Sequence, residues 1–357
     1  MTATTAGTAR PPRPERPPLA TRLFGTRRAT LLTLLVGALV AWVCLATAYW
    51  AVVDATVPWA PAGACTGRSG ACWPFILDKG PLILFGTYDH AERWRPALAS
   101  LLLLALAGAT LFGRLGAKVL AVSWGVALVA FLVLMGGGLL GLEPVAASRW
   151  NGIPVLLFLA AFGLALAFPV GLVLALGRRS PLPLVARLAT AYIEVIRGVP
   201  MVTMLFFGVF VLPLVVPGGR VEPIYAALAA LVMFHAAYVA EDLRGGLQTV
   251  GRGQYDSAHA LGFRDWPLMR YIVLPQAVRA ATPALTNTAI GGFKDTSLVV
   301  IVGLHDLMAT AKMAYNDPAW QGRALEAYVF VGAIFFVICW AVSAAGRRLE
   351  RRLAPPG

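Results

Sequence analysis

The stretch WNGIPVLLFLAAFGLALAFPVGLVLALG, residues 150–177, contains no charged side chain. An α-helix rises about 1.5 Å per residue, so roughly 20 apolar residues cross the ~30 Å hydrocarbon core of a bilayer. This run exceeds that length and consists almost entirely of apolar residues. It therefore predicts a helix that spans a membrane.

The same pattern recurs along the chain. The charge-free runs, together with residues 281–304, predict eight helices. They lie at about 29–52, 97–113, 118–140, 153–176, 199–216, 223–243, 281–304 and 326–346. The hydrophobic fraction of 59% is above the level of about 45–50% that is usual for soluble domains. Short alternating segments typical of a membrane barrel do not occur, so we predict an all-α, polytopic membrane bundle of about eight transmembrane helices.

The distribution of Lys and Arg predicts the orientation of the bundle. The segments on the side of the two termini hold 21 of these residues and the opposite loops hold 8, while Lys294 falls inside a helix. Positive residues are retained on the cytoplasmic side of a membrane. We therefore expect both termini and the loop 244–280 to be cytoplasmic, and we read the net charge of +13 as a topology signal. No nucleic-acid partner is predicted.

The predicted organisation has four parts. They are a disordered basic cytoplasmic tail (1–28), three N-terminal transmembrane helices with a periplasmic loop (29–150), five further helices with the cytoplasmic loop 244–280 (151–346), and a cytoplasmic C-terminal tail (347–357). The first apolar run lacks a nearby small-residue cleavage site, so we expect it to be a retained helix.

Two cysteines fall in the first predicted periplasmic loop. Cys65 and Cys72 both lie in the stretch CTGRSGACW (65–73), in which Gly67 and Gly70 can close a small ring. The bacterial periplasm is oxidising, so a disulfide between these cysteines is predicted. A metal site would need more ligands than the loop supplies, and no metal is predicted.

The long cytoplasmic loop reads RGGLQTVGRGQYDSAHALGFRDWPLMRYIVLPQAVRA over residues 244–280. Residues 255–262 have helical spacing, and a short apolar run, 271–274, ends at Pro275. This pattern predicts two short helices that lie along the membrane and offer a protrusion to a partner. The alternative is a folded loop that binds no partner.

The pattern D-S-A-x3-G-x9-I-x-L-P in this loop resembles the EAA coupling loop of ABC-importer permeases. Its anchor residues are Asp256, Ser257, Ala258, Gly262, Ile272, Leu274 and Pro275. Asp stands for the usual Glu, which keeps the charge, and Ser stands for the usual Ala, which keeps the size. The resemblance implies that these residues couple the chain to a separate ATP-binding subunit.

Other segments resemble the permeases of polar and general L-amino-acid importers. They are SGACWPFI (69–76), LALGRRS (174–180), YIEVIRGVPMVTMLFF (192–207), AAYVAEDLRGGLQTVGRGQYDSA (236–258), GFKDTSLVVIVGLHDL (292–307) and DPAW (317–320). The resemblance implies a five-helix type I ABC-importer core over 151–346 in the bacterial inner membrane. It also implies an ATP-binding subunit dimer, a second permease subunit (a sister chain or a second copy) and a periplasmic amino-acid-binding protein as partners.

A Walker A loop requires Gly-x4-Gly-Lys-Ser/Thr to bind phosphates. The four lysines of this chain are followed by Gly, Val, Asp and Met, so the motif is absent from the sequence. We therefore expect a transporter subunit that is not itself an enzyme and has no cofactor of its own, with ATP used by the partner.

Charged residues inside predicted spans, with a hydroxyl residue beside them, are the second notable feature. The set consists of Lys294, Asp295, Thr296, Glu241 and Asp242. Charged groups in a bilayer are costly unless they are paired or hydrated, and they are usually functional. Neighbours on a helix do not face each other, so the two residues of the other helix, Glu241 and Asp242, are the expected partners of Lys294.

We interpret this set as a substrate site, because lysine and acids together complement the carboxylate and ammonium of an amino acid. Gly291 and Gly292 are expected to unwind the helix and expose backbone groups there. The alternative interpretation is a structural ion pair. At the level of the whole protein, the alternatives are a permease for another small polar solute, a proton-driven secondary transporter and an intramembrane enzyme.

Overall fold

The computed structural model describes residues 18–113, 116–216 and 221–353. Throughout these ranges the regular elements are helices, and two isolated β-bridges are the nearest approach to sheet structure. The predicted all-α class is confirmed. The chain divides into two compact units, residues 1–74 and 75–357, while the four-part organisation drawn from the sequence stays a prediction.

The first unit contains the short helix α1 (Leu19–Phe24) and the long helix α2 (Arg27–Ala48), which a π-turn extends over Tyr49–Val53. The Thr26 hydroxyl accepts a hydrogen bond from the Ala29 amide at 3.2 Å and so caps α2. Helix α2 buries none of its residues, as expected for a helix that faces lipid. The predicted tail up to residue 17 lies outside the described residues.

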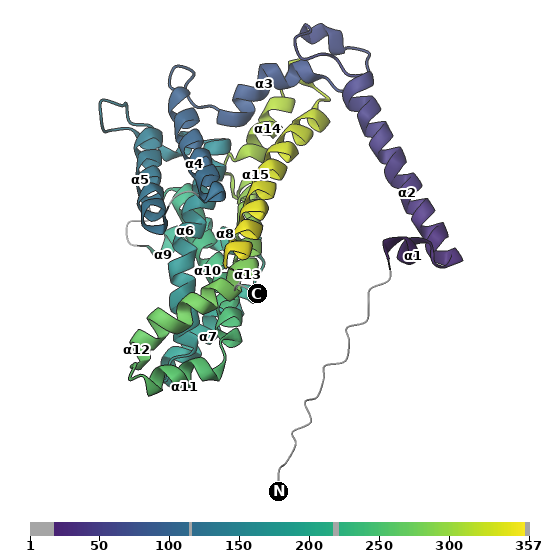
Figure 1. Ribbon diagram of the computed structural model, residues 1–357. Helices are drawn as coiled ribbons and strands as arrows, with labels where there is room; N and C mark the ends of the chain where they lie inside the picture. Colours follow the sequence, from purple (N-terminus) through teal and green to yellow (C-terminus); the bar gives the residue numbers. More distant parts are fainter. Residues whose placement is uncertain (1–17, 114–115, 217–220, 354–357) are drawn as a thin grey trace. The chain divides into compact units, whose positions relative to one another are not determined.

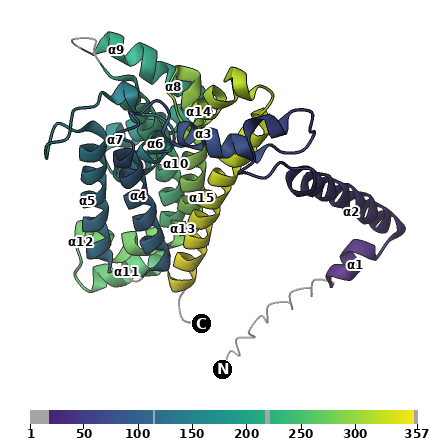
Figure 2. The same cartoon turned by 90° about the horizontal axis from the view of Figure 1, so that it is seen from above.

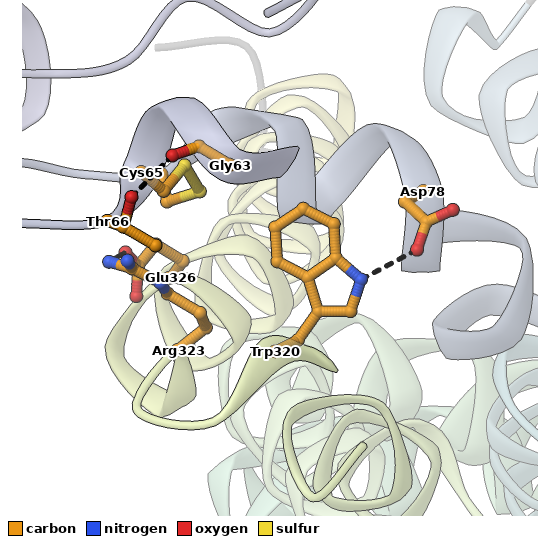
Figure 3. Close-up of a disulfide and its surroundings, with 8 residues drawn as sticks. Gly63, Cys65, Thr66, Asp78, Trp320, Arg323 and Glu326 are labelled. Carbon is orange, nitrogen blue, oxygen red and sulfur yellow. Dashed lines mark hydrogen bonds and ion pairs between the residues drawn. A yellow bond between two sulfur atoms is a disulfide. The ribbon is translucent and has the colours of Figure 1, made fainter. Parts of the chain in front are cut away.

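The loop that follows α2 contains the disulfide. Cys65 closes a 3₁₀ turn (Ala62–Cys65), and Cys72 immediately precedes helix α3 (Trp73–Phe85). The two sulfur atoms are bonded, with Cα atoms 5.7 Å apart (Figure 3). The Thr66 hydroxyl donates to the Gly63 carbonyl at 2.6 Å, so the turn is also held by hydrogen bonding.

Replacing Cys65 and Cys72 together by serine should loosen this loop. A ring this small contributes at most about 2–3 kcal/mol in the chain-entropy account of disulfides, so we expect faster proteolysis of residues 54–72 in the variant. Mass spectrometry of non-reduced peptides should find the two cysteines linked in the native chain. The variant Cys44→Ser, which removes a free cysteine, should leave the proteolysis rate unchanged. Two free thiols in protein from an oxidising compartment would contradict the assignment.

The second unit is a helical bundle (Figure 1). Its longer helices are α4 (Trp94–Phe112), α5 (Ala117–Gly136), α6 (Ile153–Arg178), α7 (Pro183–Gly198), α10 (Pro223–Thr249), α13 (Leu274–Asp295) and α15 (Ala324–Leu353). The shorter ones are α8 (Met201–Phe206), α9 (Leu212–Val215), α11 (Arg252–Ala260), α12 (Asp265–Leu268) and α14 (Leu307–Tyr315). Helices α13 and α15 lie side by side in both views (Figures 1 and 2).

Within the described residues, five helices are long and apolar enough to cross a membrane, and a bent pair raises the number to six. The bent pair joins Pro183–Gly198 to Met201–Val215 at an angle of 108°. From the sequence, residues 183–198 were expected to lie in a loop between two helices. They form α7 instead, because Ala189, Ile193 and Ile196 make one buried apolar face.

Helix α13 also begins earlier than predicted. Pro275 was expected to end a short loop helix, but it occupies the first turn of α13, which starts at Leu274. Proline is favoured there because its fixed φ suits a helix and the first turn needs no backbone donor. The helix that carries the predicted site therefore continues directly from the coupling motif.

Helices α6 and α10 form the centre of the bundle. A Cβ atom at Gly171 would lie 2.7 Å from Val239 Cγ1, so only glycine permits this approach of the two helices. Around the contact, the buried side chains form an apolar cluster that comprises Ala175, Ile193, Val239, Ala240, Leu243 and Ala281. The cluster joins α6, α7, α10 and α13 and holds their polar residues at fixed positions.

Helix α3 lies at the end of the bundle opposite α11 and α12 (Figure 1). It contacts the loop before α15 there (Figure 3). The Trp320 indole donates to Asp78 Oδ2 at 2.7 Å, and its ring packs edge-on against Phe75. Lys79 pairs with Asp317 at 2.7 Å, and its ammonium holds the pKa of that carboxyl below its usual range. The DPAW segment thus binds residues that lie more than 230 positions earlier in the chain, since its Trp320 is 242 residues from Asp78.

Candidate functional site

The predicted polar set lies on α10, on α13 and, for Thr296, on the 3₁₀ segment that follows α13, but it does not form one cluster. Lys294 is exposed at the end of α13 and forms no ion pair within the described residues. The Thr296 side chain is completely buried, and its hydroxyl donates to the Phe293 carbonyl at 2.7 Å. Lys294 is thus available to a ligand, whereas the Thr296 hydroxyl is already used.

The expected pairing of Lys294 with Glu241 or Asp242 is wrong. Glu241 is bound by arginines, and Asp242 Oδ2 accepts a hydrogen bond from the Thr288 hydroxyl at 2.6 Å. Both acids lie in the C-terminal third of α10, whereas Lys294 lies at the C-terminal end of α13, which runs antiparallel to α10. The physical reason is distance along the helix axis, because Asp242 lies opposite Thr288 and Lys294 is a further ~9 Å along α13 at 1.5 Å per residue.

Asp295 has a partner on α10. Its Oδ2 atom lies 3.6 Å from His235 Nε2, and His235 is almost fully buried on α10. Gly292 makes room for this imidazole, because a Cβ atom there would lie 3.2 Å from His235 Cε1 and 3.0 Å from Leu164 Cδ2. The expectation that Gly291 and Gly292 unwind the helix is therefore wrong. The helix tightens to a 3₁₀ form only after Asp295.

The structure contains a second polar cluster, which the sequence did not identify as a cluster. The Glu241 carboxylate accepts hydrogen bonds from Arg244 at 2.5 and 2.9 Å. It also lies 3.3 Å from Arg178 and 3.7 Å from Arg197. Glu194 completes the cluster by pairing with Arg178 at 2.8 Å.

This arginine cluster joins the ends of three helices, because its members come from α6, α7 and α10. Glu241 is only 21% exposed, so its bonds are shielded from solvent and are stronger than those of a surface pair. Arg178, Arg197 and Glu241 each border a charge-free run of the sequence, and that position is the signal from which the cluster could have been inferred.

The coupling motif has two sides. Buried residues on the anchoring side pack against the bundle, and exposed residues form the side that we call the displayed side. Ala258 is the one buried residue of α11, and it packs with an apolar cluster that includes Leu247, Val273 and Ala277. Ile272 packs against the same cluster. Ala258 was expected to contact the partner, but its burial shows that it holds α11 against the bundle.

Gly262 ends α11 in a left-handed conformation. Its φ is +81°, and the Phe263 amide donates to the Ala258 carbonyl at 3.0 Å, which closes the turn. Only glycine adopts this conformation without strain. In the described part of the chain, no atom lies within 4 Å of the position that a Cβ atom of residue 262 would take. The glycine is therefore required by the backbone turn and not by close packing.

The displayed side of the loop carries large apolar residues. Leu261 is 77% exposed, Trp266 64% and Tyr271 68%, and the neighbouring motif residues Asp256 and Ser257 are exposed as well. Exposed apolar residues gathered on one loop are typical of a protein interface. Figure 1 places α11 and α12 together at one end of the bundle, where a partner has access to them.

Comparison with known proteins agrees with this arrangement. The family described as binding-protein-dependent transport system inner membrane component matches residues 167–355. The chain is 40% identical to the inner membrane amino-acid ABC transporter permease protein YhdY of Escherichia coli K12 over 310 residues, which are 85% of this chain and 83% of that protein. It is 33% identical to the glutamine transport system permease protein GlnP of Escherichia coli K12 over 211 residues, covering 57% and 95% of the two chains.

The solved structures include a similar chain. The crystal structure of an amino acid ABC transporter with histidines matches with a TM-score of 0.51 and 32% identity, covering 57% of this chain and 92% of that one. The family match covers more than half of the sequence and includes α10, the coupling motif and α13. The chain therefore belongs to the family of binding-protein-dependent transport system inner membrane components.

Proposed function

We propose that this chain is a permease subunit that carries L-amino acids from the periplasm to the cytoplasm across the bacterial inner membrane. The proposal rests on the structure of the coupling loop. Buried residues hold this loop against the bundle, and three apolar residues of the loop are exposed at one end of the bundle. The nature of the cargo is supported by the relatives, which are named as amino-acid and glutamine permeases.

The energy comes from a separate ATP-binding subunit dimer that docks on the loop 244–280, so the chain needs no cofactor of its own. A second permease subunit, either a sister chain or a second copy, completes the membrane part, and a periplasmic amino-acid-binding protein delivers the cargo. The asymmetry in Lys and Arg supports cytoplasmic positions for the loop and both termini.

Lys294 is the residue that we propose binds the carboxylate of the cargo, with Asp295 beside it. Lys294 is exposed at the end of α13, and it lacks a protein counter-charge within the described residues. An ammonium group without a counter-charge is stabilised when an anionic group of a ligand approaches it.

Transport in reconstituted vesicles tests this function against the alternatives. Uptake of radiolabelled L-amino acids should require ATP on the side of the coupling loop and should persist after an ionophore collapses the proton gradient. A secondary transporter would behave in the opposite way. Uptake of other small polar solutes in preference to amino acids would contradict the proposed cargo.

Trp266→Ser should weaken docking of the ATPase. Tryptophan residues at the centre of an interface commonly contribute about 2 kcal/mol or more, which corresponds to a roughly thirtyfold weaker complex. The measurement is the amount of ATPase retained by the purified permease at increasing dilution. Trp59→Ser is the matched control, because Trp59 is also highly exposed, at 81%, but lies far from the loop in sequence. Equal retention by both variants would show that the displayed side is not the docking surface.

A further inference from the structure

A cavity of about 830 Å³ opens between the coupling loop and the bundle. One wall comes from the start of α11, with Gln254 and Ser257, and the other walls come from α13 and the end of α15, with Gln276, Arg279 and Glu350. Its volume is within the range of about 300–1,000 Å³ that small-molecule sites occupy. The cavity is separate from Lys294, which does not line it.

The charged residues of this cavity have opposite signs and come from different helices. Arg279 belongs to α13 and Glu350 to α15. Within the described residues, neither forms an ion pair or a side-chain hydrogen bond, with each other or with another residue. A guanidinium and a carboxylate are therefore both available inside one cavity.

The remaining polar side chains limit the shape of a ligand. Gln276 Nε2 donates to the Ile272 carbonyl at 2.9 Å and to Gln254 Oε1 at 3.3 Å. This pair of glutamines links the loop to α13 across one side of the cavity. The hydroxyl of Ser257 adds a group that both donates and accepts.

We propose that this cavity binds a zwitterionic α-amino acid from the cytoplasm. The Arg279 guanidinium suits a carboxylate, which it can bind through two parallel hydrogen bonds, and the Glu350 carboxylate suits the ammonium group. A simple anion would be repelled by Glu350, and a simple cation would be repelled by Arg279. A ligand that carries both charges satisfies both residues.

The site has a consequence for transport that rests on the proposed function. A ligand in the cavity contacts both the coupling loop and the bundle. It therefore favours conformations in which the distance between the loop and the bundle stays the same. A ligand shifts such an equilibrium by its difference in affinity between the states. Accumulated amino acid in the cytoplasm would therefore slow further import by holding the coupling loop.

The test measures binding of radiolabelled L-glutamine and L-alanine to the full chain in nanodiscs made without phosphatidylethanolamine. We expect saturable binding of both amino acids, because the site contacts the groups that they share. N-acetyl-L-glutamine lacks the ammonium, and L-glutamine amide lacks the carboxylate, so each should compete at least tenfold less well than L-glutamine. Competition by inorganic phosphate that equals competition by L-glutamine would overturn the proposal and indicate an anion site.

Variants locate the site. Arg279→Gln and Glu350→Gln should each weaken binding at least tenfold, whereas Arg351→Gln, on the same helix as Glu350 but outside the cavity, should not. Binding that survives in both cavity variants but disappears in Lys294→Met would place the amino acid at the other site and overturn the proposal. Displacement of L-glutamine by added phosphatidylethanolamine would overturn it as well, because the cavity would then hold a lipid headgroup.

The consequence for transport is measured separately in vesicles loaded with L-glutamine on the side of the coupling loop. Loading should lower ATP-dependent uptake severalfold in the native protein, and the ratio of loaded to unloaded uptake should approach one in Arg279→Gln. Unchanged inhibition in that variant would reject the regulatory role. If ATP-dependent uptake occurs while binding at the cavity is absent, the inference fails and the proposed function stands. If no uptake occurs in any preparation, the proposed function itself fails.

Discussion

Glu241→Gln should reduce amino-acid uptake at least tenfold and lower the thermal stability of the solubilised protein by a few degrees. In the native chain one carboxylate offsets three guanidinium groups from Arg178, Arg197 and Arg244. The glutamine amide keeps the size of the side chain but removes the negative charge. Leaving shielded polar groups without their partner costs about 1–3 kcal/mol, and the three arginines would then repel one another.

The effect on uptake should exceed the effect on stability because the cluster joins the ends of α6, α7 and α10, and α10 leads directly into the coupling loop. We infer that a movement of that loop would be transmitted to the bundle through these contacts. We therefore expect the variant to retain its ATPase while ATP hydrolysis no longer drives uptake. The measurements are the ATPase rate and the uptake rate of the same preparation.

Glu194→Gln is the matched control for this prediction. Glu194 is 58% exposed and, within the described residues, pairs with Arg178 alone, and exposed ion pairs contribute about 0–1 kcal/mol. Its uptake should stay within about twofold of the native rate. Equal losses in the two variants would contradict the central position of Glu241, and normal uptake by Glu241→Gln would remove the cluster from the coupling mechanism.

Lys294→Met should abolish most amino-acid uptake while the permease still assembles with its ATPase. Methionine keeps much of the apolar length of lysine but cannot bind a carboxylate. A hydrogen bond to a charged group contributes about 1.5–3 kcal/mol, so we expect a loss of roughly ten- to hundredfold. The structure favours this outcome over a loss of stability, because within the described residues the substitution leaves no acid without its ion-pair partner.

The yield of the solubilised complex and the uptake of radiolabelled amino acids are measured together in this variant. Lys118→Met, which removes a lysine at the start of α5, should preserve both quantities. A parallel loss of yield and uptake in Lys294→Met would favour the structural interpretation. Unchanged uptake would exclude Lys294 from the cargo site and would leave the second permease subunit as the place where cargo binds.

Several features follow from local sequence alone. The charge-free run at 150–177 predicts α6 because length and apolar character suffice to define a membrane-spanning helix, whatever its neighbours are. The spacing of Asp256, Gly262 and Pro275 similarly identifies the coupling loop. The family assignment could be made from these motifs, since each is a short pattern within one segment.

Other elements depended on contacts that the sequence does not display. Residues 183–198 contain enough polar side chains to resemble a loop, and they form α7 because their apolar face packs on α6 and α10. Pro275 resembled a terminator, although it begins α13. In both cases the local pattern is compatible with two structures, and packing against the bundle selects one of them.

The partners of the polar residues were decided only by the tertiary structure. The sequence identified Lys294 and Glu241 as unusual, because charge is rare inside apolar runs. It could not pair them correctly, since a pairing depends on how far each residue lies along its own helix axis and on which helix faces it. Those two quantities place Glu241 among arginines of α6, α7 and α10 and place His235 opposite Asp295. They also leave Lys294 exposed, because the antiparallel packing of α10 and α13 sets its height in the bundle.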